Sequence, residues 1–415
     1  MRISTIQIFN IANNSIRDSS NAIAKTQEQL STGQRILTAS DDPVGAAKVL
    51  ELEHNLSRIE QYGKNIDLAE NSLSLEETTL DSVSNLIQRV RELAVKAGNT
   101  ATHTPQDYQN IASEINARID ELKELMNAQN AAGDYIFAGY KGGEAPFTGN
   151  AQAGFEFLGS EGGLNIKVSE STSVQVSDSG KDIFWNIPAA ENSMRTSASS
   201  VNTADPAAKI SVGQIVDQEA YDAFYPEDMI ITYDQGTDSL SFTERSTGLP
   251  VTDPVSGLPM TGIPYTPGTD IEVHGVSVRM TGQPDDGDQF FIDSSPNQDI
   301  LTTLSRFSEA MSNYDGSEDS KTALTTVVGN TLDNLDNTQE VLSQTTATLG
   351  ARFNTLDSMR EQHLDTQLYT QEVLGEIRDL DYAEAATRLS AQSLILDAAQ
   401  ASFMRVSQLT LFSRM

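Results

Sequence analysis

Residues 52–87 decide the fold; they read LEHNLSRIEQYGKNIDLAENSLSLEETTLDSVSNLI, with an apolar residue at every seventh position. This first series consists of Leu52, Ile59, Ile66, Leu73, Leu80 and Ile87. Apolar residues at this interval form a seam along one face of an α-helix, and the seam needs a partner helix to cover it. A second series near the other end of the chain consists of Val328, Leu335, Leu342, Leu349 and Leu356. Because the two periods match, we predict that these two seams pair within one subunit as its helical core.

Two outer seams repeat the spacing at the extreme ends of the chain. Their members are Phe9, Ile16, Ile23, Leu30 and Leu37 at the N-terminal end, with Leu389, Leu396 and Phe403 at the C-terminal end. Val406, three residues after Phe403, is expected to pack with the C-terminal seam. Opposite the N-terminal seam lie the small or polar residues Ala12, Ser19 and Thr26. A helix with an apolar seam on one side and small or polar residues on the other is poorly ordered alone. We therefore expect these terminal arms to pack between subunits, in a heterologous ring or tube. The alternative is an intramolecular bundle and nothing more.

Start and stop signals set the expected helix bounds. Asp42 followed by Pro43 is typical of an N-cap with a first-turn proline, and Gly98-Asn99 is typical of a helix end. Thr104-Pro105 and Ser295-Pro296 indicate two further starts. Gly33 is a candidate break in the first helix. The expected helices cover residues 4–37, 43–97, 105–130, 296–314, 318–374 and 382–412.

The middle of the chain has a different composition. Most of the 13 prolines lie between residues 133 and 295, among short β-prone runs separated by turn signals. One helix is expected at about 204–225. Trp185 is expected in the β-domain core, with a surface contact to a neighbour as the alternative. The expected strands are 135–140, 165–168, 173–176, 229–233, 239–243, 273–280 and 289–292.

These patterns predict an α+β multidomain protein. A long antiparallel α-helical bundle or coiled coil is expected to form from both termini, with one or two mostly-β domains inserted. The expected domains are the terminal arms, 1–40 and 382–415, the α-helical rod, 41–134 and 296–381, and an outward-facing β insert, 135–295.

Charge and composition exclude several function classes. The formal net charge is −32 in 415 residues, which disfavours nucleic acid and anionic membranes as partners, since both select basic surfaces. The sequence has no cysteine, so disulfides and thiolate chemistry are excluded. No apolar run is long enough for a transmembrane helix. The N-terminus shows no signal-peptide core, so any export is expected to occur without a cleaved signal.

Candidate metal and catalytic sites have simpler interpretations. Asp41-Asp42 precedes a proline and is interpreted as a helix cap. The run Asp285-Asp286-Gly287-Asp288 lacks the alternation and final glutamate of an EF-hand loop, and a turn is expected instead. The four histidines have no metal-ligand spacing, and no phosphate loop or catalytic triad order is visible. We therefore predict no metal, no cofactor and no enzyme activity.

Four segments resemble the flagellin superfamily of bacterial flagella and, within it, the hook–filament junction proteins. They are the start, Met1-Arg2-Ile3-Ser4-Thr5, the stretch 30–35 followed by Ser40-Asp41-Asp42-Pro43, the run Tyr135-Ile136-Phe137-Ala138-Gly139-Tyr140 followed by Lys141, and the end, 401–403 with 409–412. The third run is the most specific, because flagellins resemble the first helix but not this segment. The middle of the chain resembles the family poorly.

The resemblance implies a structural role outside the cell. Subunits of such a protein are exported unfolded through the flagellar type III apparatus, with a cytoplasmic chaperone on the C-terminal helix. They pack with copies of themselves on hook-associated protein 1 at the distal end of the hook, and flagellin polymerises beyond them. The alternatives are a flagellin that forms the filament itself or, from another class, a coiled-coil adhesin or signalling protein.

Overall fold

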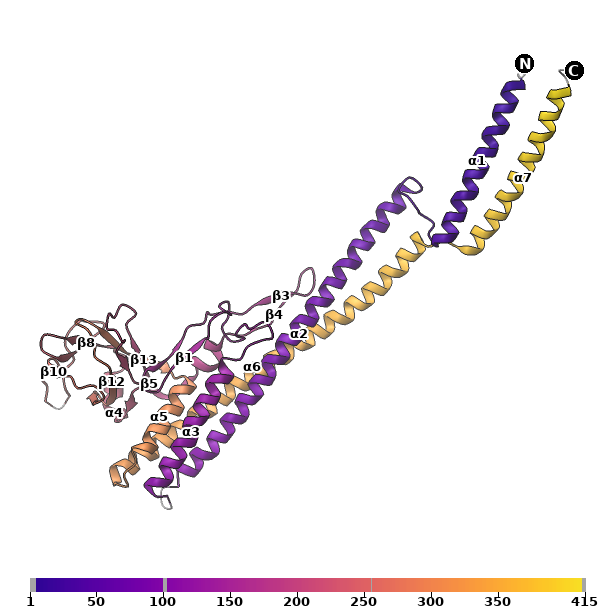
Figure 1. The fold of residues 1–415 in the computed structure, drawn as a ribbon. Helices are drawn as coiled ribbons and strands as arrows, with labels where there is room; N and C mark the ends of the chain where they lie inside the picture. The colour runs from indigo at the N-terminus through magenta and orange to yellow at the C-terminus, as the bar shows by residue number, and fades with distance from the viewer. Residues whose placement is uncertain (1–4, 100–102, 255, 413–415) are drawn as a thin grey trace. The chain divides into compact units, whose positions relative to one another are not determined.

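The computed structural model describes residues 5–99, 103–254 and 256–412 (Figure 1). The chain divides into two compact units. One unit combines the residues up to Asn65 with those from Ser358 onward, and the other comprises Ile66–Asp357. The helices are α1 (Thr5–Thr32), α2 (Pro43–Ala97), α3 (Pro105–Met126), α4 (Gln218–Phe224), α5 (Ile300–Ser312), α6 (Glu318–Arg378) and α7 (Tyr382–Phe412). The fold class predicted from the sequence, long terminal helices around a mostly-β insert, is confirmed.

In the first unit, α1 packs along α7. The hydroxyl of the buried Thr26 donates to Gln392 Oε1 at 2.9 Å, and the rings of Phe9 and Phe403 lie 5.0 Å apart. Helix α1 ends at Thr32 because Gly33 follows with φ +71°, a conformation that favours glycine. The predicted break at Gly33 is therefore the end of the helix, and Leu37 lies beyond it.

The link between α1 and α2 is held by the end of α6 and the segment that follows it. The backbone N–H of Arg35 donates to the Arg378 carbonyl at 2.7 Å, and Leu380 N–H donates to the Gly33 carbonyl at 2.9 Å. Helix α2 then begins at Pro43, with Asp42 Oδ1 accepting from Gly45 N–H at 2.9 Å. This bond is the cap predicted from the Asp-Pro pair.

In the second unit, the inner seams of α2 and α6 are buried. Ile66, Leu73, Leu80 and Ile87 are at most 2% exposed, as are Leu335, Leu342, Leu349 and Leu356. Burying one such side chain stabilises the fold by about 1.5–3 kcal/mol. Helix α3 packs along α5, and the capping box of Thr104 with Asp107 starts α3 where the sequence predicts it.

The insert consists of short antiparallel strands. A five-stranded sheet has the order β10-β9-β8-β13-β5, and a smaller sheet has β12 between β11 and β6, with β7 also on β12. Two separate hairpins are formed by β1 with β2 and by β3 with β4. The strands are β1 (Phe147–Asn150), β2 (Gly154–Phe157), β3 (Asn165–Lys167), β4 (Ser173–Gln175), β5 (Pro188–Ala198), β6 (Lys209–Ile210), β7 (Gln214–Ile215), β8 (Met229–Asp234), β9 (Ser239–Glu244), β10 (Ile263–Pro264), β11 (Asp270–Val273), β12 (Val276–Thr281) and β13 (Gln289–Asn297).

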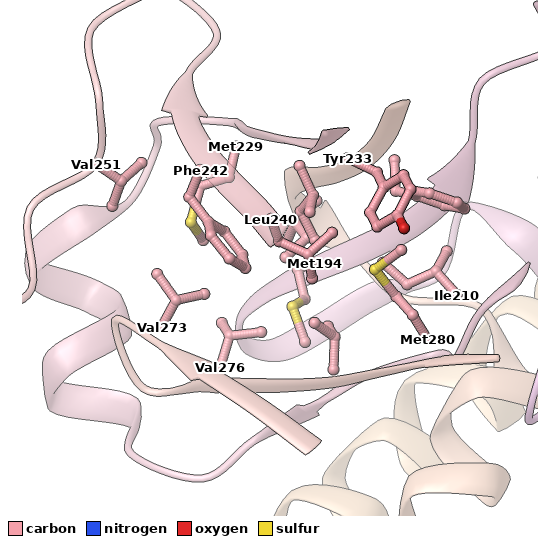
Figure 2. Close-up of a cluster of buried hydrophobic side chains, with 14 of the residues drawn as sticks. Met194, Ile210, Met229, Tyr233, Leu240, Phe242, Val251, Val273, Val276 and Met280 are labelled. Atoms are coloured by element: carbon pink, nitrogen blue, oxygen red, sulfur yellow. The ribbon is translucent and has the colours of Figure 1, made fainter. Parts of the chain in front are cut away.

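One apolar cluster joins the two larger sheets. Figure 2 shows Leu240 and Phe242 from β9 beside Met194 from β5 and Val276 from β12. All four side chains are fully buried. The alternation of buried residues along these strands places one face of each strand in this core.

Several expectations for the insert are wrong. Residues 273–280 form a hairpin rather than one strand, because His274 and Gly275 adopt φ +43° and +74° and turn the chain between β11 and β12. The predicted helix at 204–225 shortens to α4. Trp185, expected in the β-domain core, ends a single π-helical turn, η1 (Lys181–Trp185), and is half-buried.

The expected helix start at Ser295-Pro296 is also wrong. Both residues belong to β13, and the register of β13 against β5 shifts between Ser295 and Asn297. A proline has no N–H to give to the ladder and is tolerated at such an irregularity. Helix α5 starts at Ile300 instead, with Asp299 as its cap.

Candidate assembly surface

The predicted arm residues lie along the α1–α7 pair. Phe9 is 46% exposed, while Ile16, Ile23 and Leu30 of α1 are half-buried. On α7, Leu389, Leu396 and Phe403 are half-buried, and the side chain of Val406 lies outside the described residues. Part of each seam is therefore covered by the other helix of the same chain. Packing of these residues between subunits stays a prediction.

Sequence reasoning missed a second set of apolar side chains on the same two helices. On α7, Leu394 is 71% exposed, Ile395 57% and Met404 59%; on α1, Ile11 is 62% exposed. A large apolar side chain that stays this open on a helix marks a surface suited to association. The run Leu394-Ile395-Leu396 is the signal that could have revealed it, since three consecutive apolar residues cannot all face one partner helix.

Exposed apolar side chains also lie on the parts of α2 and α6 that belong to the first unit. On α6, Leu364, Leu368 and Tyr369 are 59–68% exposed. On α2, Val44 and Leu50 are 81% and 56% exposed. In the first unit, α2 and α6 thus also carry exposed apolar side chains outside the predicted seams.

The residues of the predicted intrasubunit core lie inside the chain. Leu52 and Val328 are 8% and 5% exposed, and Ile59 is half-buried. Between α2 and α6, the hydroxyl of Ser84 and the amide of Gln339 lie within hydrogen-bond distance, and Arg91 forms an ion pair with Asp336. Most residues of the inner seams are thus covered within one chain.

Asp41-Asp42-Pro43, part of the second segment that resembles the flagellin superfamily, organises the turn before α2. Asp41 Oδ2 accepts from the backbone N–H groups of Leu37 and Thr38 at 3.2 and 3.1 Å, and Lys25 donates to Oδ1. The hydrogen bond from Lys25, followed by the one from Thr38, lowers the pKa of Asp41. Both aspartates of this segment thus bind protein groups as turn and cap residues.

The third resembling segment, Tyr135 to Tyr140, is a series of turns and not the expected strand. Phe137 and Ala138 are fully buried, Tyr135 and Ile136 are half-buried, and Tyr140 is 64% exposed. Gly139 has φ +64°, and a Cβ there would lie 2.3 Å from the Ser160 carbonyl oxygen. This close approach requires glycine and bends the chain out of an extended conformation.

No cation site emerges among the residues that the structure describes. No group of three or more potential metal-ligating side chains is found there. In the acidic turn before β13, Asp288 Oδ1 accepts from Thr203 N–H at 2.8 Å and Oδ2 from Asp285 N–H at 2.9 Å. Nor does any helix in this described part have the length and apolarity to cross a membrane.

Comparisons with known proteins point to the flagellum. The family described as the bacterial flagellin N-terminal helical region matches residues 3–142. Flagellar hook-associated protein 3 of Salmonella typhimurium is 34% identical over 187 residues, 45% of this chain and 58% of that protein. A flagellin of Escherichia coli is 32% identical over 139 residues, 33% of this chain and 27% of the flagellin. The chain thus spans little more than half the length of the first of these relatives.

A solved structure extends the similarity over more of the chain. The crystal structure of flagellar hook-associated protein 3 from Legionella pneumophila is 26% identical, with a TM-score of 0.53. The match covers 79% of this chain and 99% of that one. None of the three names is that of an enzyme, in agreement with the sequence prediction. The resemblance predicted from the sequence is confirmed: this chain is similar to flagellar hook-associated protein 3, and its residues 3–142 match the N-terminal helical region of bacterial flagellins.

Proposed function

We propose that the chain is a structural subunit of the bacterial flagellum at the junction between hook and filament. Copies of it join one another through α1 and α7 in the flagellar axis. We further propose that the subunits are seated on hook-associated protein 1 and provide the first surface for flagellin. They travel unfolded through the export apparatus, with a cytoplasmic chaperone on α7, and act outside the cell.

One observation carries this proposal: apolar side chains stay exposed on α7 although α1 already packs along it. Leu394 and Ile395 are the clearest case, at 71% and 57% exposed. Burial of a leucine or isoleucine side chain contributes about 1.5–3 kcal/mol, so two of them in each copy supply a substantial part of a subunit contact. The similarity to hook-associated protein 3 supports a position of these subunits at the hook of the flagellum.

The test replaces the exposed pair and leaves the fold intact. The double variant Leu394→Asp/Ile395→Asp puts two negative charges on the proposed contact, and the control Ser390→Asp/Gln400→Asp puts two negative charges at exposed polar positions of α7. We expect intact hooks, no filaments and flagellin released to the medium for the double variant, seen by electron microscopy and blotting. The control is expected to swim normally, and both purified subunits are expected to keep the wild-type melting temperature.

Two outcomes would contradict the proposal. Normal filaments in the double variant would show that α7 makes no essential contact there. Deletion of the whole gene separates a junction protein from a flagellin. Loss of filaments without flagellin in the medium would identify the chain as the filament protein itself.

A further inference from the structure

A buried carboxyl group lies where the segment after β4 meets α2. Glu76 of α2 is 2% exposed. Its Oε1 accepts from the backbone N–H of Asp178 at 3.3 Å. Its Oε2 is buried, and none of the residues that the structure describes supplies it with a hydrogen bond. A buried polar atom without a partner is uncommon and costly, so this carboxyl group calls for a physical explanation.

The nearby cation is already engaged. Arg352 of α6 donates to both carboxylate oxygens of Asp178, at 2.7 and 2.8 Å, and both side chains of this pair are 15% exposed. Gln175 Nε2 donates a third bond to Asp178 at 2.7 Å. The positive charge of Arg352 therefore balances Asp178, and a second negative charge on Glu76 would be left without compensation.

These surroundings favour the protonated form of Glu76. Burial first, and then the negative charge of Asp178, raise the pKa of Glu76 to about 8, although Arg352 opposes the shift. The charged groups that act on it are thus Asp178, from the segment after β4, and Arg352, from α6. With Glu76 protonated the three side chains are neutral together. With Glu76 ionised they carry one uncompensated negative charge.

We propose that Glu76 is a proton-dependent latch, which holds the β3–β4 segment, residues 163–179, on the α2–α6 pair while protonated and releases it on ionisation. The segment depends on this attachment, because β3 and β4 have only three residues each. A two-stranded hairpin of this size is marginal in water without something to pack on. Bonds within the segment, for example Val176 N–H to the Leu164 carbonyl at 2.8 Å, close the hairpin on itself and do not attach it to the helices.

The direction of the pH effect follows from linkage. While the segment is docked, the pKa of Glu76 lies above the ordinary value of 4.5, which is expected once release of the segment exposes the group. The latch is therefore fully stabilising below about pH 4.5, and its contribution is lost as the pH rises toward about 8. Between these limits one proton leaves on opening, so the opening constant rises about tenfold per pH unit.

Hydrogen exchange on the full chain tests the latch. Exchange at residues 163–179 is measured at pH 5.5 and 7.5 and corrected for the intrinsic pH dependence of amide exchange. We expect the opening constant of the wild-type protein to rise about 100-fold over these two units. Glu76→Gln, which cannot ionise but can donate to Asp178, is expected to show no such rise. Glu60→Gln, at an exposed position of the same helix, is expected to follow the wild-type protein.

A purely structural role of Glu76 would not produce this difference in pH profile. Parallel profiles for the wild-type protein and Glu76→Gln would overturn the proposal. Glu76→Met provides a second variant of similar size should the glutamine variant fail to fold. A flat profile for either variant beside a rising wild-type profile supports the latch.

Discussion

At the scale of single residues, Arg306 of α5 is a buried cation that binds the β insert through several hydrogen bonds. It is 8% exposed and donates to the backbone carbonyls of Gly213 at 2.9 Å and Met194 at 3.1 Å. It also donates to Gln298 Oε1 at 2.6 Å. Burial lowers the pKa of Arg306 to about 10, with Asp299 opposing the shift, so the group remains charged at neutral pH. One side chain thus ties α5 to strand β5 and to the turn between β6 and β7.

Arg306→Met is expected to lower the free energy of unfolding by about 3 kcal/mol, because it leaves buried carbonyl oxygens without donors. Urea titration followed by circular dichroism measures the loss. Arg245→Met is the matched control, since that side chain is 51% exposed and pairs with Asp293 on the surface, where a pair contributes about 0–1 kcal/mol. Equal losses in the two variants would show that the buried network adds nothing.

At the scale of elements, the inner seams of α2 and α6 carry the helical part of the second unit. Leu342 of α6 is 2% exposed, and the next residue, Ser343, is exposed. Leu342→Asp puts an unpaired charge in the seam and is expected to cost about 4 kcal/mol or more. Ser343→Asp introduces the same charge on the open face and is expected to change stability by about 0.5 kcal/mol or less. Thermal unfolding of both variants gives the comparison, and similar melting temperatures would contradict the paired-seam core.

The same elements show what a sequence can and cannot predict. The last helix, Tyr382–Phe412, matches its predicted bounds, because a long periodic run between turn signals leaves few alternatives. The turns at Gly139 and at His274-Gly275 were missed, because each depends on contacts with distant parts of the chain or on positive φ angles within an apolar run. For the assembly surface, the seven-residue spacing predicts that α1 and α7 are helices with an apolar seam. The exposure of Leu394 depends on which face of α7 is covered by α1, and spacing alone does not determine that face.

At the scale of the whole molecule, the two compact units differ in how well their helices are covered. In the second unit the seam residues are almost completely buried, whereas in the α1–α7 pair they are at most half-buried. Local opening free energy follows the buried apolar area that opening exposes. The terminal pair should therefore open far more easily than the central seams in an isolated subunit, and contacts with neighbouring subunits should remove this difference.

Hydrogen exchange of the purified, monomeric full chain measures this gradient. We expect the amides of Ile16 and Leu396 to exchange at least about 100-fold faster than those of Leu73 and Leu342, which corresponds to about 2.7 kcal/mol of opening free energy. The central pair serves as the internal control for the stability of the folded subunit. In assembled flagella the arms should become protected, because the exposed side chains of α7 are then covered. Equal protection of arms and seams in the monomer would mean that α1 and α7 already pack as stably as the central seams without neighbouring subunits. That result would contradict a role of subunit contacts in stabilising the arms.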